Sequence, residues 1–152
     1  MYFEVVQRLF ILHPVIPLSK FHPLEKETQM RIEISWKSGR IEAVLDDTIT
    51  ARLVWEALPH AASASTWGEE VYFELPVRAE IEDDARLVVD PGTVCFWTGG
   101  NSLALPYGPT PASQSDECRL VTEVNILGHI EGDPRALSSV RDGMEICVVR
   151  VE

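Results

Sequence analysis

The chain has 152 residues, of which 45% are apolar, and its 24 acidic against 13 basic side chains give a formal net charge of −11. This length predicts one domain that buries a sizeable core without a metal or a disulfide to hold it together. The negative charge repels phosphate backbones, so nucleic acid is not an expected partner.

An apolar segment, residues 2–18, lies within an N-terminal extension of residues 1–29, and we place the main domain at residues 30–152. Glu4 and Arg8 interrupt the apolar run and Pro14 breaks it, so it falls short of the ~18 apolar residues that a membrane-spanning helix needs. Two interpretations remain open: an extension added by an upstream start, or an arm that packs on this or another subunit, which we prefer. We therefore expect a cytoplasmic protein with no membrane partner, in which the arm would make a homo-oligomer.

A metal or cofactor is not expected. The three cysteines are an odd number at spacings that fit neither a zinc site nor a redox pair, and Cys95 and Cys147 lie in apolar patterns typical of small buried side chains in a reducing cytosol. The histidines lie in separate segments without ligand spacing: His13, His22, His60 and His129. No glycine-rich phosphate-binding loop is present.

The main domain opens with a predicted hairpin and a helix. Residues 31–37 and 40–45 flank Ser38-Gly39, a pair suited to a tight turn. Asp46-Asp47-Thr48 then offers capping oxygens to a helix over residues 49–58, where apolar side chains recur at helical spacing. The small residues that follow, up to position 65, are typical of a loop.

The next stretch, residues 66–75, runs from a polar and aromatic loop straight into an alternating strand. One face of this strand is apolar, with Val71, Phe73 and Leu75. By parity Glu69 belongs to the same face, at its entrance. Glu70 belongs to the opposite face, and we expect it to be solvated.

Glu69 is the candidate catalytic residue. A carboxylate at the edge of an apolar surface should have a raised pKa through desolvation, which suits a general acid or base. The alternative is that Glu69 caps the turn or pairs with a basic side chain such as Arg31 or Arg150.

The rest of the chain alternates short apolar segments with turns. It predicts a strand remnant and an acidic turn within residues 77–84, and strands over residues 93–97, 102–105, 120–130 and 144–151. Gly128 indicates a bulge or a close approach. Asp133-Pro134 predicts the N-cap and first position of a short helix over residues 135–140. The total of seven or eight strands and two helices is typical of an antiparallel barrel or sandwich.

A rim pocket is predicted where the Trp67–Glu70 stretch, the end of the Trp97 strand and the Tyr107–Pro111 loop would meet. Such a pocket would combine apolar walls with a few polar groups and bind a small molecule or a short peptide. The candidate ligand-binding residues are Thr66, Trp67, Glu70, Tyr72, Trp97, Tyr107, Thr110 and Asn125. For the aromatic members the alternative is an ordinary core position.

Several motifs together resemble a family of small prokaryotic proteins of cyclophilin-like fold whose role is uncharacterised. These motifs span residues 30 to 151 and are Met30–Ile34, Thr66–Phe73, Pro91–Trp97, Tyr107–Pro111 and Val124–Gly128. The resemblance implies a closed β-barrel of about eight strands with a helix capping each end.

The catalytic signature of cyclophilins is missing from this chain. It has neither a phenylalanine-histidine-arginine-valine element nor a glutamine-glycine-glycine-aspartate element, so the arginine that prolyl isomerases direct at the proline carbonyl has no counterpart. Ligand binding at the rim is the favoured function. A weak prolyl isomerase and a non-enzymatic oligomerising module remain the alternatives.

Overall fold

The computed structural model describes residues 29–152. The predicted arm falls on residues that lie almost entirely outside this range, so its role in oligomerisation stays a prediction.

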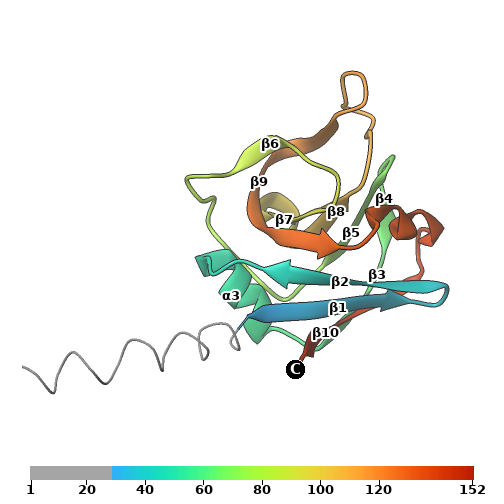
Figure 1. Ribbon diagram of the computed structural model, residues 1–152. Coiled ribbons are helices and arrows are strands. Elements are labelled where there is room, and N and C mark those ends of the chain that lie inside the picture. The colour runs from blue at the N-terminus through green and yellow to red at the C-terminus, as the bar shows by residue number, and fades with distance from the viewer. Residues whose placement is uncertain (1–28) are drawn as a thin grey trace, which may run out of the picture.

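The described residues form ten antiparallel strands with few short helices (Figure 1). The strands are β1 (Met30–Trp36), β2 (Gly39–Leu45), β3 (His60–Ser63), β4 (Ser65–Thr66), β5 (Glu70–Glu74), β6 (Arg86–Val89), β7 (Thr93–Trp97), β8 (Ser102–Pro106), β9 (Cys118–Glu131) and β10 (Glu145–Val151). The helices are α3 (Ile49–Glu56) and the 3-10 helices η1 (Thr98–Gly100) and η2 (Pro134–Ser139).

The strands follow the order β3-β10-β1-β2-β9-β7-β8-β5-β4, with β6 attached to β9. The two end strands, β3 and β4, are separated in the chain by Ala64 alone, so the sheet curls almost completely round. Within residues 29–152, however, β3 pairs only with β10 and not with β5. The closed barrel that the resemblance implies is therefore not found. We call the gap between β3 and residues 74–78 the seam.

The predicted hairpin is confirmed, since β1 and β2 pair from Met30↔Leu45 to Trp36↔Gly39. The predicted first helix is confirmed as α3, whose N-cap Thr48 accepts a hydrogen bond from the N–H of Ala51 at 3.1 Å. Its buried face packs on the core below the end of β2.

The second predicted helix forms as the 3-10 helix η2. Asp133 caps it by accepting a hydrogen bond from the N–H of Arg135 at 2.9 Å, and Pro134 opens it as predicted. Trp36 donates its indole N–H to Ser139 Oγ at 2.8 Å, which ties η2 to the β1–β2 turn. Figure 1 shows α3 and η2 at opposite ends of this hairpin.

Two apolar clusters bury the two faces of β5, β7 and β8. The larger one fills the inside of the curled sheet and includes Phe73, Phe96 and Leu103. The smaller one lies on the outer face, where β6 and the first half of β9 cover Cys95 and Ala104. These three strands are therefore buried on both faces, which the alternating sequence of β5 does not indicate.

Gly128 allows β9 to curl between these layers. A Cβ atom at this position would overlap the carbonyl oxygen of Val44 on β2, and the pairing of β9 with β7 shifts register between Val94 and Cys95. The prediction of a bulge or close approach at Gly128 is confirmed.

Two segment assignments from the sequence are wrong. Residues 61–65 belong mostly to β3 and β4 rather than to a loop. Residues 77–84 form no strand, although the predicted acidic turn is found at Asp83 and Asp84. The first segment lacks an apolar pattern because it is small and polar, and it becomes extended through its pairing with β10 and β5. The second is held by side-chain hydrogen bonds instead of a strand ladder.

Candidate functional site

The Trp67–Glu70 turn and the Tyr107–Pro111 loop meet, as the rim-pocket hypothesis requires. Glu69 donates its N–H to the carbonyl oxygen of Pro109 at 2.8 Å, and the first residue of the loop donates its N–H to Glu69 O at 2.8 Å. Gly68 has a φ of +61°, and a Cβ there would lie 2.9 Å from Pro109 O, so this position requires glycine. The two segments form one tightly packed unit.

The Glu69 side chain is 36% exposed and lies 3.3 Å from a guanidinium nitrogen of Arg135 in η2. Pairing with an arginine was the alternative to catalysis, although the partner is neither Arg31 nor Arg150. The guanidinium also lies 5.9 Å from the ring centroid of Tyr107. Burial raises the pKa of Tyr107, the Glu69 carboxylate adds to this, and Arg135 opposes it.

Glu70 is the buried carboxylate of this turn, with a relative exposure of 6%. The expectation that it is solvated is wrong, because the face of β5 that it shares with Tyr72 is covered by the second cluster. Its Oε1 has no hydrogen-bond partner among residues 29–152. Burial raises the pKa of Glu70 to about 7.

Two thiols share the surroundings of Glu70. Cys95 and Cys118 are both free and buried, and burial raises the pKa of both. For Cys118 the pKa reaches about 11, with the Asp90 carboxylate as the next cause. Burial therefore favours the neutral thiol form of both side chains at neutral pH. Cys95 is the small buried side chain that the sequence predicts, whereas Cys147 is half-buried.

Asn125, a candidate ligand-binding residue, is completely buried and uses its amide inside the fold. Its Nδ2 donates to Thr50 Oγ1 at 3.0 Å and to Glu80 O at 2.8 Å, and its Oδ1 accepts from the N–H of Glu82 at 2.8 Å. This amide holds the segment before β6 against α3.

Thr66 and Thr110 also use their hydroxyl groups within the protein. Thr66 donates its N–H and its Oγ1 to Asp142 Oδ1, at 2.6 and 2.8 Å. The Thr110 hydroxyl donates to the carbonyl oxygen of Arg119, and the Thr110 N–H donates to Ser113 Oγ at 2.8 Å. Both residues stabilise turns in the described structure.

Trp97 lies away from the other two predicted pocket elements. It pairs with Ser102, at the start of β8, whereas Tyr107 follows the other end of that strand. The two ends of β8, Ser102 and Pro106, are four steps apart along the strand, roughly 14 Å. Trp97 instead packs edge to face on Tyr72, with ring centroids 6.0 Å apart and an interplanar angle of 84°. The three predicted elements do not assemble at one place.

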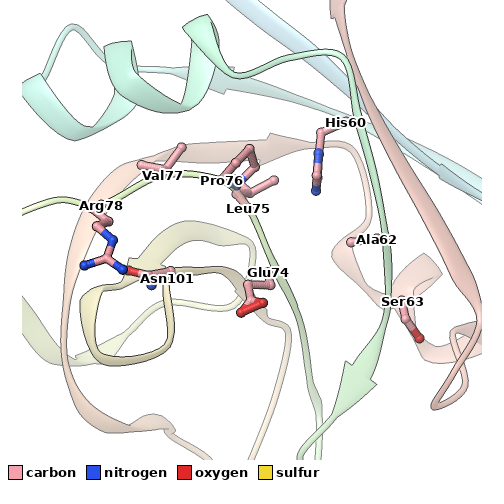
Figure 2. Close-up of a pocket in the computed structure, with 9 residues that line it drawn as sticks. All are labelled: His60, Ala62, Ser63, Glu74, Leu75, Pro76, Val77, Arg78 and Asn101. Atoms are coloured by element: carbon pink, nitrogen blue, oxygen red, sulfur yellow. The ribbon is translucent and has the colours of Figure 1, made fainter.

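A cleft of about 760 Å³ lies elsewhere, at the seam (Figure 2). His60, Ala62 and Ser63 of β3 form one wall, and residues 74–78 form the other, with Asn101 beside them. The volume falls in the range of ligand-binding sites, roughly 300–1,000 Å³. None of the sequence-predicted site residues lines this cleft.

The register of β4 and β5 explains why the seam opens. Ser65 pairs with Tyr72 and Thr66 with Val71, and the same register continued would pair residue 63 with 74 and residue 61 with Pro76. Proline has no N–H to give to such a ladder. The hairpin therefore pairs beside the Trp67 turn and separates towards Pro76, where the sheet would otherwise close.

The cleft combines apolar and ionisable side chains. Leu75 and Val77 are buried beneath it, while His60, Glu74 and Arg78 bring titratable groups to its walls. Figure 2 shows the Arg78 side chain extending towards Asn101. The sequence carries one signal for this site, namely a proline that ends an alternating strand. That signal has meaning only once residues 60–63 are known to be extended.

No helix within residues 29–152 combines the length and apolar character needed to cross a membrane. In the same residues no group of three or more histidine, cysteine, aspartate or glutamate side chains is placed to hold a metal ion together.

Comparison with known proteins places the chain in a family. A family model described as Cyclophilin-like matches residues 30–149. The solution structure of the hypothetical protein AF2241 from Archaeoglobus fulgidus is similar, with 33% sequence identity, a TM-score of 0.70, and coverage of 81% of this chain and 95% of that chain. A search of curated proteins found no match. The matched family model covers most of the chain, and the chain therefore belongs to the cyclophilin-like family.

Proposed function

We propose that this protein is a binding module that takes up a short peptide or a small molecule in the seam cleft. The observation that carries the proposal is the cleft itself, about 760 Å³ in volume, with apolar side chains beneath it and ionisable side chains on its walls. The cleft replaces the Trp67 rim as the proposed site, because the Trp97 strand end lies away from the other two elements of the rim pocket.

The polar groups of the predicted rim are largely engaged within the protein, which also favours the cleft. Glu69 pairs with Arg135, and the Thr110 and Asn125 side chains bond inside the fold. Arg78, by contrast, is exposed and lines the cleft. A carboxylate or carbonyl group of a ligand would meet a cationic donor there.

The test is to titrate isotope-labelled full-length protein with a pool of random hexapeptides and, separately, with a library of metabolite-sized compounds. We expect amide shifts at residues 60–63, 74–78 and 101. Arg78→Ala should weaken the binding roughly fivefold, a loss of about 1 kcal/mol. Arg86→Ala, which removes another exposed arginine, from β6, is the matched control. Shifts centred on Glu69 and Tyr107 would return the site to the rim, and no shift with either library would contradict the proposal.

Weak prolyl isomerisation is the catalytic alternative, and Arg78 is the observation in its favour. Arg78 is the arginine of the cleft, so it is the cation that a proline carbonyl bound there would meet. A protease-coupled assay with a proline peptide decides between the two functions. We expect isomerisation no faster than the uncatalysed tens of seconds. A faster rate that Arg78→Ala removes would make the protein an enzyme.

A further inference from the structure

We infer that the ligand of the seam is an extended peptide whose main chain pairs with the free edge of β3 and adds a strand to the sheet. This inference rests on the proposed function and names its ligand class. Peptide recognition by strand addition draws its affinity from main-chain hydrogen bonds and its selectivity from alternate side chains.

The pairing of β3 with β10 shows which of its main-chain groups are free. Ala64 donates its N–H to Met144 O at 2.8 Å, and residues 62 and 146 share the same register. Because hydrogen-bonded pairs alternate along an antiparallel ladder, residues 60, 62 and 64 direct their main-chain groups at β10. The N–H and C=O groups of Ala61 and Ser63 therefore face the seam.

The opposite wall presents main-chain groups as well. Leu75 donates its N–H to Asn101 O at 2.9 Å, so its main chain faces β8. By the same alternation, the main-chain groups of Glu74 and the carbonyl group of Pro76 face the seam. Repeated N–H and C=O groups on two facing walls match the repeat of a polypeptide main chain.

The edge of β3 has only one of the features that usually limit strand addition, namely its short length. Exposed edge strands are commonly protected by charged side chains, prolines, bulges or a covering segment. The sequence His60-Ala61-Ala62-Ser63 has no lysine, glutamate or proline, and Ala61 and Ser63 are exposed. The edge is short, about 13 Å for four residues, which limits the paired segment to about four residues.

The side chains around the seam predict an alternating ligand. Inward-facing ligand side chains would meet Ala62, Leu75 and Val77, which favour small or aliphatic groups. Outward-facing ones would lie beside Glu74 and Arg78, which favours opposite charges at those two positions. We therefore expect an apolar-polar-apolar-polar segment with an acidic residue near Arg78.

The experiment compares Ala61→Pro with Ala61→Val. Proline at position 61 removes one of the two N–H groups of β3 that face the seam and leaves the ladder to β10 intact, whereas valine keeps the N–H. The probe is the tightest-binding member of a random hexapeptide pool, acetylated and amidated at its ends and selected on the full-length protein. We expect Ala61→Pro to weaken its binding at least tenfold and Ala61→Val to change it less than threefold. Circular dichroism shows whether both variants are folded.

The outcomes separate the two proposals. Cleft amide shifts with equal binding to both variants would overturn strand addition and leave the cleft as the site. Selection of hexapeptides that shift amides only outside the cleft, or of none at all, would overturn this inference together with the peptide part of the proposed function. A concentration-dependent dimer that Ala61→Pro dissociates would make a second copy the occupant, which also overturns the inference.

If Ala61→Pro fails to fold, the peptide is N-methylated at alternate residues. A tenfold loss in one register only then supports strand addition, and no loss in either register overturns it.

Discussion

The two ends of β5 contrast in how their polar groups are arranged. At the start of β5, the Trp67–Glu70 turn is locked by main-chain hydrogen bonds to the Tyr107–Pro111 loop, and Glu70 is buried. Past its end, the chain leaves the sheet at Pro76 and faces β3 across a cleft of about 760 Å³. One hairpin is therefore closely packed at one end and open at the other.

This difference shows that a distinctive motif does not by itself mark a binding site. Structural requirements of the turn explain the distinctive Trp-Gly-Glu-Glu element. Gly68 adopts a positive φ, and Glu69 forms an ion pair with Arg135 of η2. The open end has ordinary residues, yet the main-chain groups that face the seam have no strand partner in the described structure. Unpaired main chain and volume, rather than unusual side chains, distinguish the open end.

The largest expected effect is at the packed end, from Glu70→Gln. The folded protein holds the Glu70 proton up to a pKa of about 7, against an ordinary value of 4.5. The unfolded chain loses that proton first, so the wild type loses stability as pH rises from about 4.5 to about 7. The loss is about 3 kcal/mol at and above pH 7.5. The unfolding free energy of Glu70→Gln, relative to that of the wild type, should therefore rise between pH 5 and pH 8, as measured by urea unfolding. Glu74→Gln at the open end is the control, and an equal pH dependence in both variants would contradict burial as the cause.

The next effect concerns the strand that pairs with the packed end. Asp142 accepts two hydrogen bonds from Thr66, so Asp142→Ala should destabilise the fold by about 1 kcal/mol. The amide of Thr66 should also exchange faster with solvent. Asp116→Ala, in an exposed turn, should change the unfolding free energy by less than about 0.5 kcal/mol. Equal losses in the two variants would show that Asp142 does not hold β4.

A smaller change in stability, but a clear change in structure, is expected from Pro76→Val. Valine supplies the N–H that the register would direct at Ala61, a gain of about 1 kcal/mol, offset by the lost conformational restriction of proline. We expect slower hydrogen exchange at Ala61 and weaker peptide binding, because the seam closes. Unchanged exchange at Ala61 would mean that contacts other than the missing N–H keep the seam open.

The smallest effect is expected for the Glu69–Arg135 pair. Both side chains are substantially exposed, and exposed ion pairs contribute less than about 1 kcal/mol. A double-mutant cycle of Glu69→Gln and Arg135→Ala should give a coupling energy within that limit, falling with added salt. A coupling above about 2 kcal/mol would instead indicate a preorganised pair, and would favour the predicted catalytic role of Glu69, which otherwise stays a prediction.

Much of the fold was predictable from local patterns. The β1–β2 hairpin, the Thr48 cap of α3 and the Asp133-Pro134 start of η2 each depend on neighbours in the chain. The close approach at Gly128 was indicated by a glycine within a strand pattern, although its partner Val44 is distant in sequence. The wrong assignments involve partners distant in sequence. Residues 60–66 become strands through β10 and β5, and Glu70 is buried by β6 and β9.

The sequence by itself therefore determined the β-rich class, the order of most elements and the turns that need glycine or proline, because these follow from backbone preferences and from period-two patterning. Only the tertiary structure decided which carboxylate is buried and where the sheet stays open. Parity along a strand identifies two faces but does not show that both are covered, and the loss of an N–H at Pro76 matters only when β3 lies opposite. Both decisions depend on which distant strands come together, and the pattern of residues within a single strand does not encode that.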